Sequence, residues 1–256
     1  MIVAHMATYP ARAHALAEQL RQLARQVDRI ELCLNEYESI PPEIGEIPEV
    51  RAFIPDTDLK DVGKFVVSPD DEDIVFFVDD DIRYPDDYVE TMLKWYAIFD
   101  GLPVVLGVHG VTYSDFYDGS PSARTVMSYR MGLEHASVVN QLGTGTTMMR
   151  GKDVPALTAM VGSTRFVDVR FARLARDAGL SLVCVGRPQG WLTDHETFRG
   201  NTDTIFHSFT TNPSSDCVSE IKRIAGFSQL NGDVALEVVR RTSHAVPNAA
   251  SSVLSR

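Results

Sequence analysis

Residues 74–87 constrain this chain more than any other stretch. Ile74–Val78 is a continuous apolar run, rich in β-branched and aromatic residues, with the length of a buried parallel strand. Three carboxylates, Asp79, Asp80 and Asp81, follow at its carboxyl end, and their mutual repulsion calls for a nearby cation. Ligands of open α/β sheets bind at this end of the strands, and hard cations take carboxylate oxygens. The stretch therefore predicts a divalent metal that bridges Asp79 and Asp81 to an anionic ligand.

The segment before this strand has the pattern of a parallel crossover unit. Residues 2–6 form a short apolar run, and apolar side chains then recur every three or four positions from Ala13 to Val27. Arg29–Leu34 and residues 50–54 offer two further strands. Strand, amphipathic helix, strand is the order that builds a parallel sheet.

Later segments continue the alternation of strands and helices. Strands are predicted at 104–108, within 141–150 and at 182–185, helices at 85–99, 168–178, 217–225 and 234–241, and an inserted loop or hairpin at 111–135. The sequence thus predicts one α/β domain with a mostly parallel central sheet flanked by helices. A small helical appendage follows it at the C-terminus.

Charge limits the classes of partner. With 24 Lys and Arg against 35 Asp and Glu, the formal net charge is −11, which argues against nucleic acid or an anionic membrane surface as a general partner. An anionic substrate must therefore be met by local cations or by a metal. No run of about 18 apolar residues and no secretory signal pattern occurs, so we expect no transmembrane segment and a soluble, cytoplasmic protein. Cys33, Cys184 and Cys217 are odd in number and predicted to be buried, reduced thiols.

The order of these motifs resembles a glycosyltransferase of the GT-A fold, close to family 2, whose Asp-x-Asp motif corresponds to residues 79–81. A bacterial subgroup associated with surface polysaccharides shares further motifs. These are Gly-Lys-Phe at 63–65, Asp-Asp-Asp-Ile-Arg-Tyr-Pro at 79–85, Gly-Val-His-Gly at 107–110, Leu-Gly-Thr-Gly-Thr at 142–146 and Gly-Trp-Leu at 190–192. The resemblance covers about residues 1–200. It implies a Rossmann-like GT-A domain at 1–206, with a donor half to about 110 and an acceptor half at 111–206, then an appendage at 207–244 and a flexible tail at 245–256.

The resemblance also implies a donor and a metal. The donor would be a nucleotide-sugar, usually carrying UDP, held by Mn²⁺ or Mg²⁺, because a metal neutralises the departing diphosphate without a proton. Asp81 would be the main metal ligand, Asp79 would lie near the ribose and the metal, and His195 would be a late metal ligand. Asp80 belongs to the same donor motif but is expected to point away. The other expected donor contacts are Thr8, Tyr9, Arg12, Asp61 and Lys64, with the Tyr9 ring beside the base.

The expected general base is Asp168, which would take the proton of the acceptor hydroxyl in an inverting transfer. Only Val167-Asp168 stands where family 2 members have a pair of carboxylates, and an acid at a helix start is also favoured by the helix dipole. On the acceptor side the candidates are His109, Gly143, Thr144 and Trp191. Gly143 and the neighbouring Gly145 are more simply explained as turn residues. The Trp191 ring is at least as compatible with packing as with a sugar contact.

Three other functions remain open at this stage. A sugar nucleotidyltransferase also uses a doubly wound sheet and a metal-holding acid, but the first loop here lacks a glycine-rich basic phosphate cradle. A phosphatase with an aspartyl nucleophile usually carries its Asp-x-Asp after the first strand. A non-catalytic nucleotide-sugar or glycan-binding module of a polysaccharide assembly would keep the donor site without a working base. In such an assembly the chain would bind other proteins and would lie at the periphery of the inner face of the membrane. Retaining stereochemistry also stays open.

Overall fold

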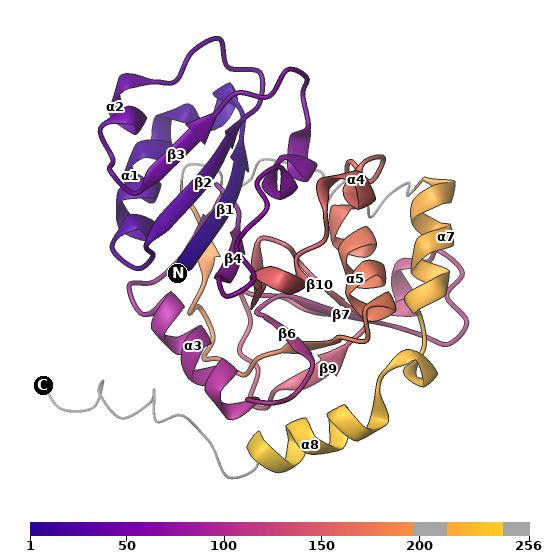
Figure 1. The fold of residues 1–256 in the computed structure, drawn as a ribbon. Helices are drawn as coiled ribbons and strands as arrows, with labels where there is room; N and C mark the ends of the chain where they lie inside the picture. The colour runs from indigo at the N-terminus through magenta and orange to yellow at the C-terminus, as the bar shows by residue number, and fades with distance from the viewer. Residues whose placement is uncertain (197–213, 243–256) are drawn as a thin grey trace, which may run out of the picture.

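The computed structural model describes residues 1–196 and 214–242 of the 256-residue chain. They form an α/β fold around an eight-stranded mixed, largely parallel sheet with the strand order β3-β2-β1-β4-β11-β6-β12-β9 (Figure 1). Smaller sheets and the C-terminal helices are added to it. The predicted tail at 245–256 and residues 197–213 of the acceptor half and appendage lie outside the described residues.

The N-terminal half of the sheet is parallel, as the sequence predicts. It contains β1 (Ile2–Thr8), β2 (Arg29–Leu34), β3 (Val50–Phe53) and β4 (Ile74–Val78). The amphipathic helix α1 (Ala13–Ala24) follows the 3₁₀ turn η1 (Pro10–Arg12) and connects β1 to β2. After β2 comes the short α2 (Pro42–Gly45), and the 3₁₀ helix η2 (Lys60–Phe65) precedes β4.

The other half of the sheet is mixed. β11 (Thr146–Arg150) runs antiparallel between β4 and β6 (Val104–Gly107), β12 (Ser181–Cys184) is parallel to β6, and β9 (Ser137–Val139) is an antiparallel edge strand. The predicted strands at 104–108 and 182–185 are confirmed. The antiparallel direction of β11 and the edge strand β9 were not predicted, because a short apolar run carries no signal of direction.

The segment at 111–135 contains a hairpin, which is one of the two expected forms. β7 (Gly110–Tyr113) pairs with β8 (Arg124–Met127) and with β10 (Gln141–Leu142), all antiparallel. A third small sheet pairs β5 (Ile82–Arg83) with β13 (Thr193–Asp194). Short 3₁₀ turns lie at η3 (Pro121–Ala123), η4 (Gly151–Asp153) and η6 (Phe227–Gln229).

Helices cover both faces of the sheet and give two hydrophobic cores. Residues of α1, α3 (Tyr88–Ile98) and α8 (Gly232–Thr242) share one core, and residues of α5 (Val167–Asp177) and α7 (Ser215–Ile224) share the other, with α4 (Leu157–Met160) beside α5 (Figure 1). In β4, Phe76 and Val78 point into the first core while Val75 and Phe77 point into the second. The expected burial of β4 on both faces is confirmed.

Two other expectations concern the whole chain. Cys33, Cys184 and Cys217 are buried and form no disulfide, as expected. Throughout residues 1–196 and 214–242, no helix combines the length and the apolar character needed to cross a bilayer.

A row of glutamines on α1 and just after it holds the turn that follows β4. The Gln19 amide donates to the carbonyls of Asp79 and Ile82, at 3.1 and 2.7 Å. Gln22 and Gln26 donate to the carbonyls of Tyr84 and Pro85 at 2.9 and 3.0 Å. Gln19 and Gln22 lie on one face of α1, because they are three residues apart, and Gln26 lies in the turn that follows the helix. Together they fix the path of the acidic turn.

We expect Gln19→Ala to lower the free energy of unfolding by about 1–3 kcal/mol, since it removes the side-chain donor of the buried Ile82 carbonyl and the shorter of the two hydrogen bonds to the Asp79 carbonyl. Glu18→Ala, at an exposed position of the same helix, is the matched control and should stay within about 0.5 kcal/mol of the native value. Urea unfolding of both variants measures the difference. Equal stability of the two would show that Gln19 does not hold the turn.

Candidate active site

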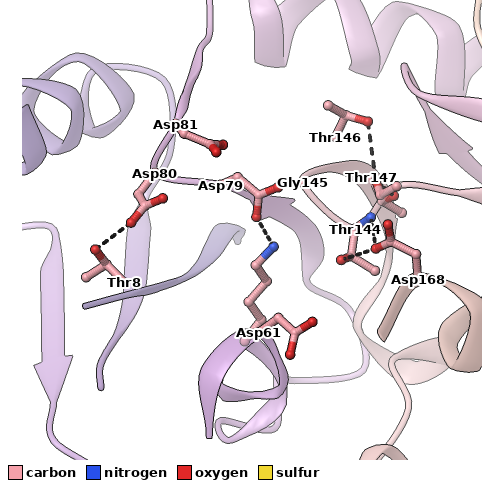
Figure 2. Close-up of polar contacts among 12 residues, drawn as sticks. Thr8, Asp61, Asp79, Asp80, Asp81, Thr144, Gly145, Thr146, Thr147 and Asp168 are labelled. Atoms are coloured by element: carbon pink, nitrogen blue, oxygen red, sulfur yellow. Dashed lines mark hydrogen bonds and ion pairs between the residues drawn. The ribbon is translucent and has the colours of Figure 1, made fainter. Parts of the chain in front are cut away.

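The site lies where the strand order of the sheet reverses. β1 and β4 are neighbours, but the chain leaves β1 toward β2 and β3 and leaves β4 toward the opposite edge. Such a switch point opens a crevice at the carboxyl ends of the two strands, which is where open α/β sheets bind ligands. Thr8 ends β1, and Asp79, Asp80 and Asp81 directly follow β4, so all four lie at this position (Figure 2).

Asp80 is the buried member of the acidic turn. Its carboxylate accepts a hydrogen bond from Thr8 Oγ1 at 2.6 Å, and an Arg12 nitrogen lies 3.9 Å from it. Burial raises the pKa of Asp80 to about 6, while Arg12 and Thr8 oppose the shift. Figure 2 shows Asp80 turned toward Thr8 and away from Asp79. Its side chain therefore joins the ends of β1 and β4.

Asp81 lies on the side of η1. Arg12 Nη2 donates to Asp81 Oδ2 at 3.2 Å, and the Asp81 side chain is 35% exposed. Burial and the charge of Asp79 raise the pKa of Asp81, while Arg12 opposes this shift. The Arg12 guanidinium also lies 5.7 Å from the centre of the Tyr9 ring, which is exposed. Arg12 thus contacts both the exposed Tyr9 ring and Asp81.

Asp79 is held from three sides. Its Oδ1 forms an ion pair with Lys64 Nζ, and its backbone amide donates to the Tyr84 hydroxyl oxygen at 2.8 Å. Tyr84 in turn donates to the carbonyl of Gly145 at 2.6 Å. Because Thr146 pairs with Val78 in the antiparallel ladder, Gly145 comes opposite Asp79, and a Cβ at this glycine would overlap Asp79 Oδ2. Glycine is required here by close approach rather than by backbone conformation.

Asp168 reaches the same end of the sheet from the first turn of α5. Its Oδ1 accepts two hydrogen bonds from Thr144, from the amide at 2.8 Å and from the hydroxyl at 2.6 Å. Within the described part of the chain, no donor reaches its Oδ2. Burial raises the pKa of Asp168, while the Thr144 hydrogen bonds and Lys64 oppose this. The side chain therefore crosses to the turn at 143–145 instead of capping its own helix (Figure 2).

Asp61 and Lys64 both come from η2. Asp61 accepts from the backbone amide of Arg165 at 3.1 Å, and burial raises its pKa to about 6. Lys64 is 4% exposed. Burial alone would lower the pKa of Lys64, but the neighbouring charges of Asp79, Asp168 and Asp61 raise it. Both predicted donor residues thus lie at the site, with Lys64 turned to the protein's own carboxylates.

The expected acceptor residues divide into two places. His109 and Gly143 are joined by a backbone hydrogen bond of 3.0 Å, and Thr144 follows at Asp168. Burial and nearby arginines lower the pKa of His109 to about 4. Trp191 lies apart from them: its indole donates to Asp87 Oδ1 at 3.0 Å, and its ring packs against Tyr88. The structure therefore brings His109, Gly143 and Thr144 together but leaves Trp191 on the side of α3.

His195 stands directly opposite Asp81. β13 pairs with β5, and the ladder continues as a hydrogen bond of 2.8 Å from the His195 amide to the Asp81 carbonyl. The two residues are 114 positions apart in the sequence, and the small sheet brings their backbones together.

The carboxylates fit a hard cation in chemistry. Asp79 and Asp81 offer partly exposed oxygen donors at one edge, with side chains 37% and 35% exposed, and oxygen is what Mg²⁺ and Mn²⁺ prefer. Among residues 1–196 and 214–242, however, no three His, Cys, Asp or Glu side chains are grouped as a metal site. A cation here would therefore take its remaining ligands from a bound molecule, as Mg²⁺ does with substrate phosphates.

Sequence reasoning missed the residues that support the acidic turn. Gln19 and Tyr84 each bind backbone atoms of this turn or of Gly145. A polar row between the apolar residues of α1 is the signal that points to Gln19, although it is also what a solvated helix face looks like. Tyr84 lies within the motif at 79–85, but the motif alone does not indicate which atoms its hydroxyl binds.

A scan of the chain against protein-family models finds no match, and a search of curated proteins finds none either. The function is therefore inferred from the site's own geometry and chemistry.

His5 in β1 anchors η2 and gives a test of this arrangement. His5 Nδ1 lies 2.9 Å from the Lys64 carbonyl oxygen, and burial, together with the charge of Arg29, lowers the pKa of His5 to about 4. Between pH 6.5 and 4 the unfolded chain binds a proton at this residue that the folded chain does not, so this contribution to stability falls as the pH falls.

We expect the stability advantage of the native protein over His5→Gln to shrink by about 3 kcal/mol between pH 7 and pH 4. Glutamine does not titrate, so the difference between the two proteins isolates His5 from all other groups. Urea unfolding at several pH values measures it. A difference that is the same at every pH would contradict the buried, neutral state of His5.

Proposed function

We propose that this chain is a metal-dependent glycosyltransferase of the GT-A type. It moves a sugar from a nucleotide-sugar donor, most simply a UDP-sugar, to a glycan or other hydroxyl acceptor. The proposal rests on the different orientations of the three carboxylates in the acidic turn. Asp80 is buried on Thr8, whereas Asp79 and Asp81 present partly exposed carboxylates at the crevice, and Asp168 arrives at the same end of the sheet.

The parallel half of the sheet supports a nucleotide donor. Its order β3-β2-β1-β4 is that of a mononucleotide-binding half of doubly wound folds, which hold nucleotides at the switch point. Tyr9 is exposed beside Arg12 at the carboxyl end of β1, where its ring offers a stacking surface for a base. Arg12 and Lys64 supply the positive charge that an overall acidic chain needs there.

A divalent cation completes the donor site in this proposal. Asp81 and Asp79 would hold it, and when bound it supplies neutralisation of the charge that develops on the diphosphate leaving group. His195 lies opposite Asp81 in the backbone ladder and is the nearest candidate for a further ligand. The protein's own part is to keep the two carboxylates at fixed positions, through Gln19, Tyr84 and the buried Asp80.

Asp168 performs the proton transfer. Both Thr144 hydrogen bonds go to Oδ1, which leaves Oδ2 to accept the proton of the acceptor hydroxyl. As that oxygen attacks the anomeric carbon, the bond from this carbon to the diphosphate oxygen breaks, and the diphosphate leaves with the electron pair. The raised pKa of Asp168, caused by burial, makes its carboxylate a stronger base. Attack opposite the leaving group inverts the anomeric centre.

Nucleotide binding tests the donor site. Isothermal titration of UDP should show binding that depends on Mn²⁺, and Asp81→Asn should weaken that metal-dependent binding at least tenfold, because it removes one of two anionic metal ligands. Asp86→Asn, at an exposed acid of the same segment, is the control and should bind as the native protein does. If neither UDP nor another nucleotide binds with Mn²⁺, the proposed function is wrong.

Turnover tests the base. Asp168→Asn should retain Mn²⁺–UDP binding but lower donor hydrolysis or transfer by about 10²–10⁴-fold, because the amide oxygen still accepts from Thr144 while no proton acceptor remains. Asp177→Asn, an exposed acid at the other end of α5, should keep full turnover. Normal turnover in Asp168→Asn would reject its role, and donor binding with no turnover even in the native protein would favour a binding module. The configuration of the product, read by proton NMR, separates inversion from retention.

A further inference from the structure

The position of Lys64 raises a question about how the site accepts a metal. The backbone of η2 is packed tightly: a Cβ on Gly63 would come within 2.6 Å of Cys33 Sγ, and His5 binds the Lys64 carbonyl at 2.9 Å. The Lys64 side chain is 3% exposed. Because the backbone is fixed, Lys64 can change its ion-pair partner only by moving its side chain.

One carboxylate oxygen of Asp79 is paired with a cation of the chain itself, although the side chain is 37% exposed. Its Oδ1 pairs with the Lys64 ammonium, and its Oδ2 lies against Gly145. Rotating the carboxylate by half a turn only exchanges the two oxygens. A cation that binds this carboxylate therefore comes close to the ammonium unless the ammonium moves away. Two positive charges on one carboxylate repel each other strongly in a crevice with little water.

Other carboxylates are within electrostatic reach of Lys64. The charges of Asp168 and Asp61 act on its ammonium in addition to that of Asp79. Asp61 lies three residues earlier in the same 3₁₀ helix, and Asp168 comes from α5. Figure 2 shows Asp61 and Asp168 on the other side of Asp79 from Asp81, so further negative charge lies there for the ammonium.

We propose that Lys64 is an exchangeable counter-ion, which neutralises Asp79 in the donor-free protein and yields this carboxylate to a divalent cation that arrives with the diphosphate. This inference rests on the proposed function, since it concerns the metal and donor of the same site. The metal alone competes with Lys64 for Asp79 and binds weakly. The diphosphate brings negative charge that offsets the ammonium, so metal and nucleotide bind cooperatively.

The first experiment measures Mn²⁺ alone, by the electron paramagnetic resonance signal of the free ion. Lys64→Met should bind Mn²⁺ without nucleotide at least tenfold more tightly than the native protein, because the competing ammonium is gone. Lys152→Met, at an exposed lysine, removes the same formal charge and should leave Mn²⁺ affinity within about twofold of native, since exposed charges are screened. Equal or weaker Mn²⁺ binding by a folded Lys64→Met protein overturns the proposal.

A second measurement uses the native protein, so it does not depend on the folding of a variant. In lysine-labelled protein, the NMR signal of the Lys64 side chain should shift when Mg²⁺ and UDP are both added. It should remain in place with UDP or Mg²⁺ alone at the same concentrations. An unchanged Lys64 signal at saturating Mg²⁺–UDP overturns the exchange but leaves the proposed function standing. A native protein that binds no nucleotide with metal overturns the proposed function instead.

Discussion

The hydrogen bond from Thr8 to Asp80 is the interaction on which the site depends. It joins the ends of β1 and β4 at the switch point and places one of three consecutive carboxylates in the interior. Three adjacent acids cannot share one orientation without strong repulsion. With Asp80 bound inward, Asp79 and Asp81 turn to the crevice on either side of it, toward Lys64 and Arg12. The outward orientation of two carboxylates thus follows from a bond made by the third.

Buried cations of the chain itself lie against the acidic turn. Arg12 is 8% exposed and Lys64 is 4% exposed, and each contacts acids of the turn. Replacing such a buried group usually destabilises a protein by several kcal/mol, although the intact pair adds little net stability. Strongly perturbed pKa values that arise from burial and specific charge partners are typical of functional sites. Asp61, Asp80, Asp81 and Asp168 all have raised pKa values here.

The sequence predicts the parallel half of the fold closely, because β4 is a continuous apolar run and α1 has a clear helical period. It also predicts that the ends of β1 and β4 meet at the crevice, since the carboxyl ends of parallel strands share one edge. Asp61, Lys64 and Asp168 were placed there by the resemblance, and Trp191 lies apart from them. The direction of β11 is not encoded in a local pattern, yet it decides that Gly145 meets Asp79. The contacts of Gln19 and Tyr84 were missed for the same reason: they depend on tertiary distance rather than on spacing.

The two sides of the crevice are mechanically connected through the segment that carries His195. Asp194 accepts from the Tyr129 hydroxyl at 2.5 Å and forms an ion pair with Arg130 at 2.6 Å, and both partners follow the hairpin strand β8. On its other side the same segment pairs with β5, next to Asp81. Tyr129 also packs against His109. The residues that follow β8 are therefore linked to the backbone of the acidic turn by contacts of Asp194 and by the pairing of β13 with β5.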